Sequence, residues 1–229
     1  MTKITTDNVL QKVDWEPLHD KVYGRLRDAL MEAQFKPGTR LSLRSIAEIL
    51  GVSVMPVRAA FLRLVAEKAL HQTANGQFMV PKIEQPEFDE IVFLRAELEG
   101  IAAELAATRR STAQVAELKS IAKKLSRAAE ANDAPTYLRL NRDFKFAVVR
   151  AAVSPVLQDL VESLWMRVGP FMSHYAKDIR HQIKIDRHDD VVAAVASGEP
   201  AIARDAMARD IVDGAAFLRE AAGFEPQSE

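Results

Sequence analysis

Serine and arginine side chains within residues 37–64 have the types and spacing of a segment that reads nucleic acid. Ser53 stands where it can cap a helix, and Arg58 lies one turn beyond Val54 on the same face of that helix. The free N–H groups at a helix N-terminus favour phosphate, and arginine can bond phosphate or a guanine edge. Arg44, on the preceding segment, can hold the nucleic-acid backbone. These residues therefore indicate contact with a DNA duplex.

Apolar spacing and chain breaks predict the elements that position these side chains. Apolar residues recur at helical spacing from residue 17 to residue 33. Ser42 can cap a second helix that ends at Leu50, and Gly51 stops it before Ser53 caps a third. Two helices separated by a short glycine-containing turn are typical of a helix-turn-helix.

A hairpin is predicted directly after the third helix. Residues 71–73 and 78–80 are typical of short strands, and Asn75-Gly76 between them predicts a type I′ turn with positive φ at both residues. The whole arrangement indicates a winged helix-turn-helix, with the hairpin tip near a neighbouring groove. The alternative interpretation is an ordinary small helical core whose arginines simply lie on the surface.

The remainder of the chain has only helical patterns, so the predicted fold class is mainly α, with a C-terminal all-α bundle. Ser111, Asp133, Ser154 and Gly198 mark four of the helix boundaries. The expected helices are 87–108, 112–131, 134–152, 155–177, 183–197 and 199–222. We accordingly expect a winged helix-turn-helix domain over 1–80, a linker over 81–86, the bundle over 87–222 and a disordered tail over 223–229.

Composition restricts the possible function classes. The 229-residue chain has no cysteine, which excludes disulfides and thiolate chemistry, and it lacks a long uncharged apolar run or a signal-peptide core. We therefore expect a cytoplasmic protein without membrane contact. Residues 1–84 have a formal charge of +3 and the remainder −4, a weak asymmetry that suits a DNA partner. The sequence has no nucleophile–base pairing, phosphate loop or HExxH-type motif, so we expect no enzyme.

The segment over 37–64 resembles the GntR family of bacterial transcription regulators. The resemblance rests on Pro37-Gly38, Gly51-Val52-Ser53 and Pro56-Val57-Arg58. The helical region resembles the FCD ligand domain of the FadR subfamily, and the two matches together span Leu18 to Leu218. The resemblance implies a regulator that binds a palindromic operator as a homodimer, and we expect it to be a repressor. The DNA-contacting positions that it implies are Arg44, Ser53, Val54, Met55, Pro56, Arg58, Asn75 and Gly76.

Four positions depart from the family pattern. Val54 and Asn75 stand where the family usually has basic residues, Ala59 where it has glutamate, and Ala69 where it has glycine. The loss of two basic groups should weaken phosphate contacts. An apolar Val54 can offer a surface to a thymine methyl group, so the operator preference should differ from that of relatives.

The resemblance also implies a polar cluster that in FCD domains holds a divalent metal and a carboxylate-bearing effector. Asn141 takes the acidic or amide position and His188 a histidine position, but Lys145 and Asp210 stand where two further histidines are usual. A lysine ammonium cannot ligate a metal. We therefore expect no required cofactor, with Lys145 replacing the metal as the fixed positive charge; a metal, if bound, would use Asn141, His188 and Asp210.

The expected effector is a small anionic metabolite, an organic or sugar acid, bound by Arg95, Asn141, Lys145, His188 and Asp210. Arg95 stands in a helix rich in apolar residues, where the family often turns an arginine toward the effector. Its alternative is a surface ion pair with Glu99, four residues on. Two other hypotheses remain: a degenerate, non-sensing helical domain with Lys145–Asp210 as a plain buried ion pair, and a metal-dependent enzyme.

Overall fold

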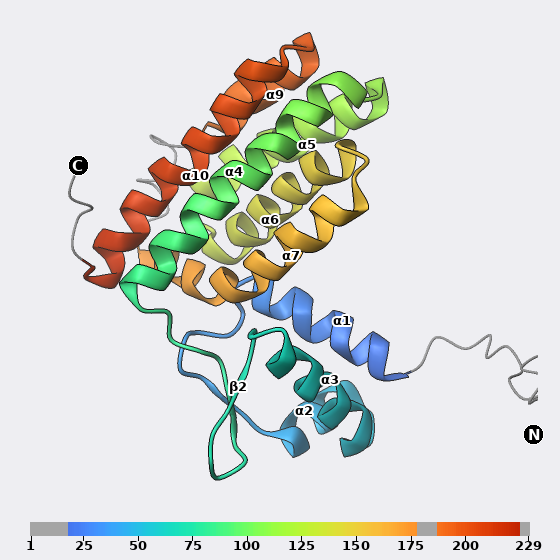
Figure 1. Ribbon diagram of the computed structural model, residues 1–229, viewed down its shortest axis with the longest axis vertical. Helices are drawn as coiled ribbons and strands as arrows, with labels where there is room; N and C mark the ends of the chain where they lie inside the picture. Colours follow the sequence, from blue (N-terminus) through green and yellow to red (C-terminus); the bar gives the residue numbers. More distant parts are fainter. Residues whose placement is uncertain (1–17, 178–186, 225–229) are drawn as a thin grey trace, which may run out of the picture.

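The computed structural model describes residues 18–177 and 187–224. Within them, the chain forms two parts (Figure 1): a head, residues 18–80, and a helical bundle, residues 85–224. Helix α1 of the head lies along the bundle, between it and the remaining elements of the head. This arrangement places the predicted nucleic-acid segment at the end of the molecule that points away from the bundle.

The head consists of three helices and three short strands around an apolar core. Its elements are α1 (Leu18–Met31), β1 (Arg40–Leu41), α2 (Leu43–Leu50), α3 (Val54–Ala66), β2 (His71–Gln72) and β3 (Phe78–Met79). Phe61 of α3 has no exposed surface and meets the ring of Phe78 edge-on, with centroids 4.9 Å apart. Leu26 and Leu30 of α1 complete this core from the other side. The recognition segment is therefore fixed to the hairpin and to α1 by apolar packing.

Ser42 and Gly51 act at the ends of α2 as the sequence predicts. The Ser42 hydroxyl accepts from the Ser45 amide at 3.4 Å, and Gly51 takes a left-handed conformation with φ of 65°. Strand β1 was not predicted. It pairs antiparallel with β3 in a sheet of order β1-β3-β2, with Arg40 opposite Met79.

The hairpin is present, but the expected type I′ turn is wrong. The Gly76 amide donates to the Thr73 carbonyl at 2.8 Å, and Gly76 has positive φ whereas Asn75 does not. A turn closed in this way and followed by a left-handed glycine is the three-residue loop with a bulge. The reason is that Ala74, in front of Asn75, lengthens the loop by one residue. The tip, Asn75-Gly76, remains exposed.

The bundle contains helices from far apart in the sequence. Its elements are α4 (Gln85–Arg109), α5 (Thr112–Glu130), α6 (Ala134–Ala151), α7 (Pro155–Val168), η2 (Gly169–Lys177), α9 (His188–Ser197) and α10 (Pro200–Ala222). The first and last of these long helices, α4 and α10, pack side by side (Figure 1). Gly100 permits their close approach, because a Cβ there would lie 3.3 Å from the Arg204 carbonyl oxygen. Capping by Ser111 and Asp133 begins α5 and α6 as predicted.

Three boundaries in the bundle differ from the expectation. The single helix predicted over 155–177 ends at Val168 and continues as the 3₁₀ segment η2, because Pro170 has no N–H to extend the α-helical ladder. Helix α4 begins at Gln85, inside the predicted linker. The expected disordered tail is wrong for its first two residues, since Phe224 stacks on Phe171 at 5.4 Å.

Other expectations fall on residues that the structure does not describe. These are the polar N-terminus, the start of the helix expected over 183–197, of which α9 is described from His188 onward, and residues 225–229. Within the described ranges, no single helix is long and apolar enough to cross a membrane; α2 and α3 reach that length only as a pair bent by 117°.

Truncation of Phe61 should destabilise the head. We expect Phe61→Ala to lower the free energy of unfolding by about 3–5 kcal/mol, because it removes a fully buried ring that joins α3 to the hairpin. Chemical denaturation followed by far-ultraviolet circular dichroism measures this loss. Leu62→Ala is the matched control on the same helix, where the side chain is 47% exposed, and should change stability by less than about 1 kcal/mol. Equal losses in the two variants would contradict this packing.

Candidate nucleic-acid interface and buried polar pocket

Three arginines surround a hollow on the surface of the head. Arg40 lies on β1, Arg44 on α2 and Arg58 on α3, and all three side chains line the same concavity and are exposed. Its remaining lining residues include Val54, Gly76 and Gln77 and no acidic residue. Within the part of the chain that the structure describes, none of these arginines forms an ion pair. The hollow is therefore an open concentration of positive charge suited to phosphate.

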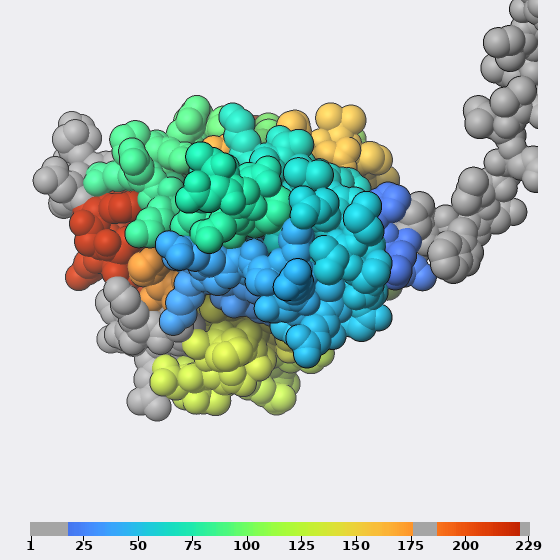
Figure 2. Space-filling model, turned by 90° about the horizontal axis from the view of Figure 1, so that it is seen from below, coloured from blue at the N-terminus to red at the C-terminus, as the bar shows by residue number. Residues whose placement is uncertain are grey.

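Figure 2 looks at this end of the molecule and shows the segments of α2, α3 and the hairpin side by side on one face. Most of the predicted DNA-contacting residues are exposed there: Arg44, Ser53, Met55, Arg58, Asn75 and Gly76, with Val54 and Pro56 half-buried. Met55, within this face, is 71% exposed.

Ser53 begins α3, but its side chain does not cap the helix. Its backbone is extended, with φ of −73° and ψ of 165°, and the hydroxyl makes no capping hydrogen bond. Ser53 thus stands at the N-cap position, as expected, but its side chain does not form the expected capping hydrogen bond. As a result, the Ser53 hydroxyl and the first amides of α3 face outward and can bond an anion.

Arg40 and Gln77 were not among the predicted contact residues. Arg40 begins the unpredicted strand β1, and its pairing with Met79 brings it beside the hairpin. The sequence offered one sign of it, a basic residue directly after the Pro37-Gly38-Thr39 break. The strand itself could not be predicted, because two residues show no periodicity, and without the strand nothing placed Arg40 beside the hairpin.

The five residues predicted for the effector line one cavity inside the bundle. Arg95 comes from α4, Asn141 and Lys145 from α6, His188 from α9 and Asp210 from α10. Tyr175 on η2, an aromatic that the sequence placed either in the pocket wall or in the core, also lines the cavity, as do Met172 on η2 and Tyr137 on α6, which were not predicted. The cavity encloses about 30 Å³, room for about one water molecule. A larger occupant would therefore have to move side chains.

The expected ion pair between Lys145 and Asp210 is present in this wall. Lys145 is 2% exposed, and its ammonium group contacts an Asp210 carboxylate oxygen and the Met207 sulfur, the latter at 3.0 Å. The other Asp210 oxygen accepts from the Arg187 amide at 2.9 Å. Burial is the largest single influence and would raise the pKa of Asp210, but the Lys145 charge and hydrogen bond, His188 and that amide together outweigh it and lower the pKa below its usual value. Asp210 is therefore ionised at neutral pH.

The donor atoms of this cluster do not fit a divalent metal. His188 Nε2 lies 3.1 Å from the Asn141 side-chain oxygen, within hydrogen-bonding distance, and the Asp210 carboxylate is engaged by Lys145. Within the described residues, no group of three or more histidine, aspartate or glutamate side chains is placed to hold a metal ion. The ammonium group lies among the atoms that would have to converge on the ion, and it would repel one.

Arg95 occupies a second buried charge cluster beside the cavity. Its Nε donates to Glu99 at 2.7 Å, and its guanidinium carbon lies 4.4 Å from the Trp165 ring centroid. The Trp165 indole donates to the same Glu99 oxygen at 2.9 Å. The pair with Glu99 therefore exists, as the alternative interpretation held, but it is buried rather than on the surface. One edge of the guanidinium is fixed by Glu99, and the side chain also reaches the cavity wall.

Comparison with family descriptions divides the chain at the same place. Residues 18–80 match the bacterial regulatory proteins of the gntR family, and residues 90–213 match the FCD domain. The basic hollow lies within the first match. The five residues predicted for the effector lie within the second: Arg95, Asn141, Lys145, His188 and Asp210.

Individual relatives agree with these matches. The chain is 35% identical over 168 residues to the HTH-type transcriptional regulator McbR of Escherichia coli, covering 73% of this chain and 76% of that one. It is 29% identical over 173 residues to a probable D-xylose utilization operon transcriptional repressor of Paenarthrobacter nicotinovorans, covering 76% and 75%. The solved structure of E. coli McbR/YncC superposes with a TM-score of 0.84 at 31% identity, covering 90% of this chain and 99% of that one. The chain belongs to the GntR family of DNA-binding transcription regulators, with an FCD domain following its helix-turn-helix.

Proposed function

We propose that this regulator is a cytoplasmic repressor whose operator affinity changes when a small organic or sugar acid enters the cavity around Lys145. The observation that supports it most is a buried lysine in the wall of a cavity, where an ammonium group is retained only with an anionic partner. Asp210 supplies that partner at present, and an effector carboxylate can share or replace it. The named D-xylose repressor among the relatives makes a sugar-derived acid a reasonable class to test.

Arg95 gives the proposed site a second positive group. Guanidinium binds a carboxylate through two parallel hydrogen bonds, and Glu99 occupies only the Nε side of Arg95 in the described residues. Asn141 and His188 would supply hydrogen-bonding groups around the rest of the acid. A metal is not needed in this arrangement, because two side-chain cations provide the charge.

On the DNA side, we propose that a homodimer places two heads on a palindromic operator. The contacts with phosphate and bases would come from Arg40, Arg44 and Arg58, with Ser53 and the Asn75-Gly76 tip beside them. Half-sites one helical turn apart are the usual geometry for two such heads. The apolar Val54 within the hollow favours a thymine methyl group over a guanine edge at its base pair.

The alternative is a regulator whose bundle senses nothing. The small size of the cavity is the observation that favours it, because about 30 Å³ does not admit an organic acid without rearrangement. The two hypotheses differ in whether any small anion stabilises the protein.

Arg58→Ala should weaken DNA binding. Fluorescence anisotropy with labelled DNA from immediately upstream of the gene measures the affinity as a function of salt. We expect a loss of about 1–3 kcal/mol if Arg58 contacts a base, or a salt dependence reduced by about one phosphate contact if it does not. Arg40→Ala should reduce the salt dependence of binding by about one phosphate contact.

The control for these variants is Arg209→Ala, which removes the same charge from an exposed position on α10. It should bind DNA as the wild type does. If Arg58→Ala binds as tightly as this control, the hollow is not the DNA-contacting surface.

Organic acids should stabilise the protein through the Lys145 cluster. Thermal melting with millimolar gluconate, xylonate, succinate or citrate should show a rise in Tm for at least one acid, equivalent to about 2.7 kcal/mol at a hundred times its Kd. The double variant Lys145→Met/Asp210→Asn keeps a neutral wall of similar volume and should lose the rise. If no acid raises the Tm of the wild type, the non-sensing alternative is favoured; an equal rise in the variant would place the site elsewhere.

Lys145→Met alone should destabilise the protein in a pH-dependent way. It leaves Asp210 buried without its cation, which costs about 3–5 kcal/mol at pH 7. In the wild type the pKa of Asp210 is depressed, so the contribution of Asp210 is complete above its unfolded pKa of about 3.9 and is lost as pH falls through the folded value. The difference in the free energy of unfolding between the wild type and Lys145→Met should therefore decrease as the pH falls from about 7 toward 4, because a protonated Asp210 needs no cation. Denaturant titrations across this range measure it, and a pH-independent deficit would contradict the pairing.

A further inference from the structure

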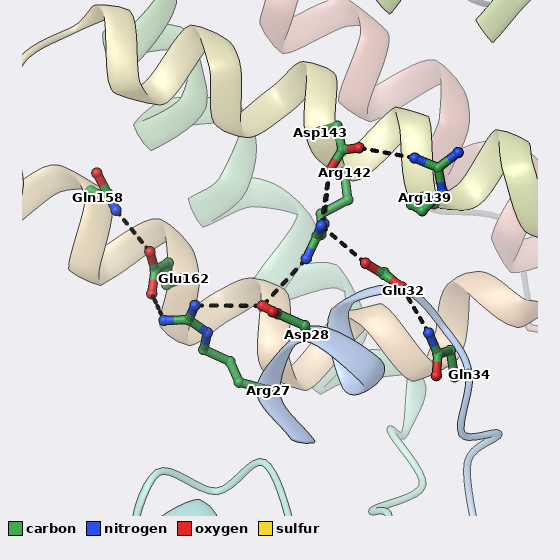
Figure 3. A network of polar contacts seen from close by, with 9 residues as sticks. All are labelled: Arg27, Asp28, Glu32, Gln34, Arg139, Arg142, Asp143, Gln158 and Glu162. Carbon is green, nitrogen blue, oxygen red and sulfur yellow. Dashed lines mark hydrogen bonds and ion pairs between the residues drawn. The ribbon is translucent and has the colours of Figure 1, made fainter. Parts of the chain in front are cut away.

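Helix α1 of the head is held against the bundle by a continuous series of charges of alternating sign (Figure 3). Arg27 of α1 donates to Glu162 of α7 at 3.0 Å and lies 3.4 Å from its neighbour Asp28. Asp28 in turn lies 3.3 Å from Arg142 of α6. The series thus links α7, α1 and α6, and the head is joined to two helices of the bundle at once.

Arg142 is the centre of this network. One terminal nitrogen contacts Asp28, and the other lies 3.0 Å from Glu32 and 2.8 Å from Asp143 (Figure 3). The Arg142 side chain is 18% exposed and that of Glu32 is 15% exposed, so this contact is better shielded from solvent than an ordinary surface pair. A planar guanidinium can hold both carboxylates in fixed positions, that of Asp28 on α1 and that of Glu32 directly after its last residue, which a lysine ammonium does less well.

The same helix forms the wall of the effector cavity. Asn141 precedes Arg142 in the sequence, and Lys145 follows it by three residues, yet both face the cavity while Arg142 faces α1. One turn of α6 therefore touches the proposed ligand on one side and the head on the other. Any rotation or shift of this turn moves both contacts together.

A second element also touches both places. Gly169, the first residue of η2, lies directly against the backbone at the end of α1: a Cβ there would be 2.5 Å from the Leu30 carbonyl oxygen and 2.7 Å from the Met31 Cα. Farther along η2, Met172 and Tyr175 line the cavity. A nine-residue 3₁₀ segment is longer than such segments usually are.

We propose that Arg142 positions the DNA-binding head and that α6 and η2 transmit occupancy of the cavity to it. The cavity has room for about one water, so an acid that enters must displace side chains of α6 or η2. Those elements also hold α1 through Arg142 and Gly169, so their displacement changes the placement of the recognition helix. The positioning role of Arg142 stands on contacts within the chain; the identity of the occupant rests on the proposed function.

The chain has no cysteine, which permits a direct test by spin labelling. Labels at Ala74→Cys on the hairpin and Ser120→Cys on α5, both exposed positions, report the distance between head and bundle by double electron–electron resonance. Labelled protein is diluted with unlabelled protein so that distances arise within one chain. We expect one narrow distance distribution for the wild type, a broad or shifted one for Arg142→Gln and an intermediate one for Arg142→Lys.

Arg150→Gln is the matched control, because Arg150 lies on the same helix and forms an exposed ion pair with Glu117 of α5, another bundle helix, rather than with the head. It should keep the narrow distribution, and all variants should keep the helical circular-dichroism spectrum of the wild type. If Arg142→Gln gives the distribution of the wild type, Arg142 does not position the head.

Transmission from the cavity is tested with Gly214→Ala, which imitates an occupant. The added methyl group would lie 2.5 Å from the Tyr175 hydroxyl, so this side chain of η2 has to move. We expect Gly214→Ala to shift the head–bundle distance in the wild-type background. In the Arg142→Gln background, we expect the same substitution to cause a smaller shift. Equal shifts in both backgrounds would overturn the coupling through Arg142. Because no ligand is used, failure of every organic acid to raise the Tm would refute the proposed sensing function without affecting this result.

Discussion

The buried ion pair between Lys145 and Asp210 is the interaction on which the organisation of the bundle depends. Lys145 is 2% exposed, and a buried cation is costly without an anionic partner, so this contact favours keeping α6 and α10 together. The pair also decides what the cavity can bind. We propose that this fixed cation takes the place of a divalent ion beside the adjacent donors and favours a carboxylate. The same residue thus sets both the packing and the proposed chemistry.

Helix α6 connects this chemistry to the DNA-binding head. Lys145 and Asn141 face the cavity, whereas Arg142 between them reaches α1. The apolar core of the head is continuous with that of the bundle, and the Tyr23 hydroxyl of α1 contacts the Met166 sulfur of α7 at 3.8 Å. We propose that communication between the two parts passes through the contacts of α1, which include the charged network around Arg142 and the close backbone contact at Gly169.

Much of this could be predicted from sequence, because helix spacing and caps are local signals. Ser42, Gly51, Ser111 and Asp133 marked boundaries that the structure confirms. Strand β1 was missed because a strand of two residues shows no alternation in the sequence. The end of the α-helix at Gly169 was missed although Pro170, which cannot donate a backbone hydrogen bond, indicates it. The burial of the pair formed by Arg95 and Glu99 could not be read, since α4 is surrounded by neighbours on most sides. The contacts of Arg142 depend on how two parts of the chain meet, which no local pattern records.

The most direct test of the account is the metal content of the protein, because the proposal makes Lys145 the charge that a metal would otherwise supply. The protein is purified without a histidine tag and without chelators, and its metals are measured by inductively coupled plasma mass spectrometry. The account predicts divalent metal far below one ion per chain. A stoichiometric divalent ion that is lost in Asp210→Asn would contradict it and would mean that Lys145 moves aside to let Asn141, His188 and Asp210 act as ligands.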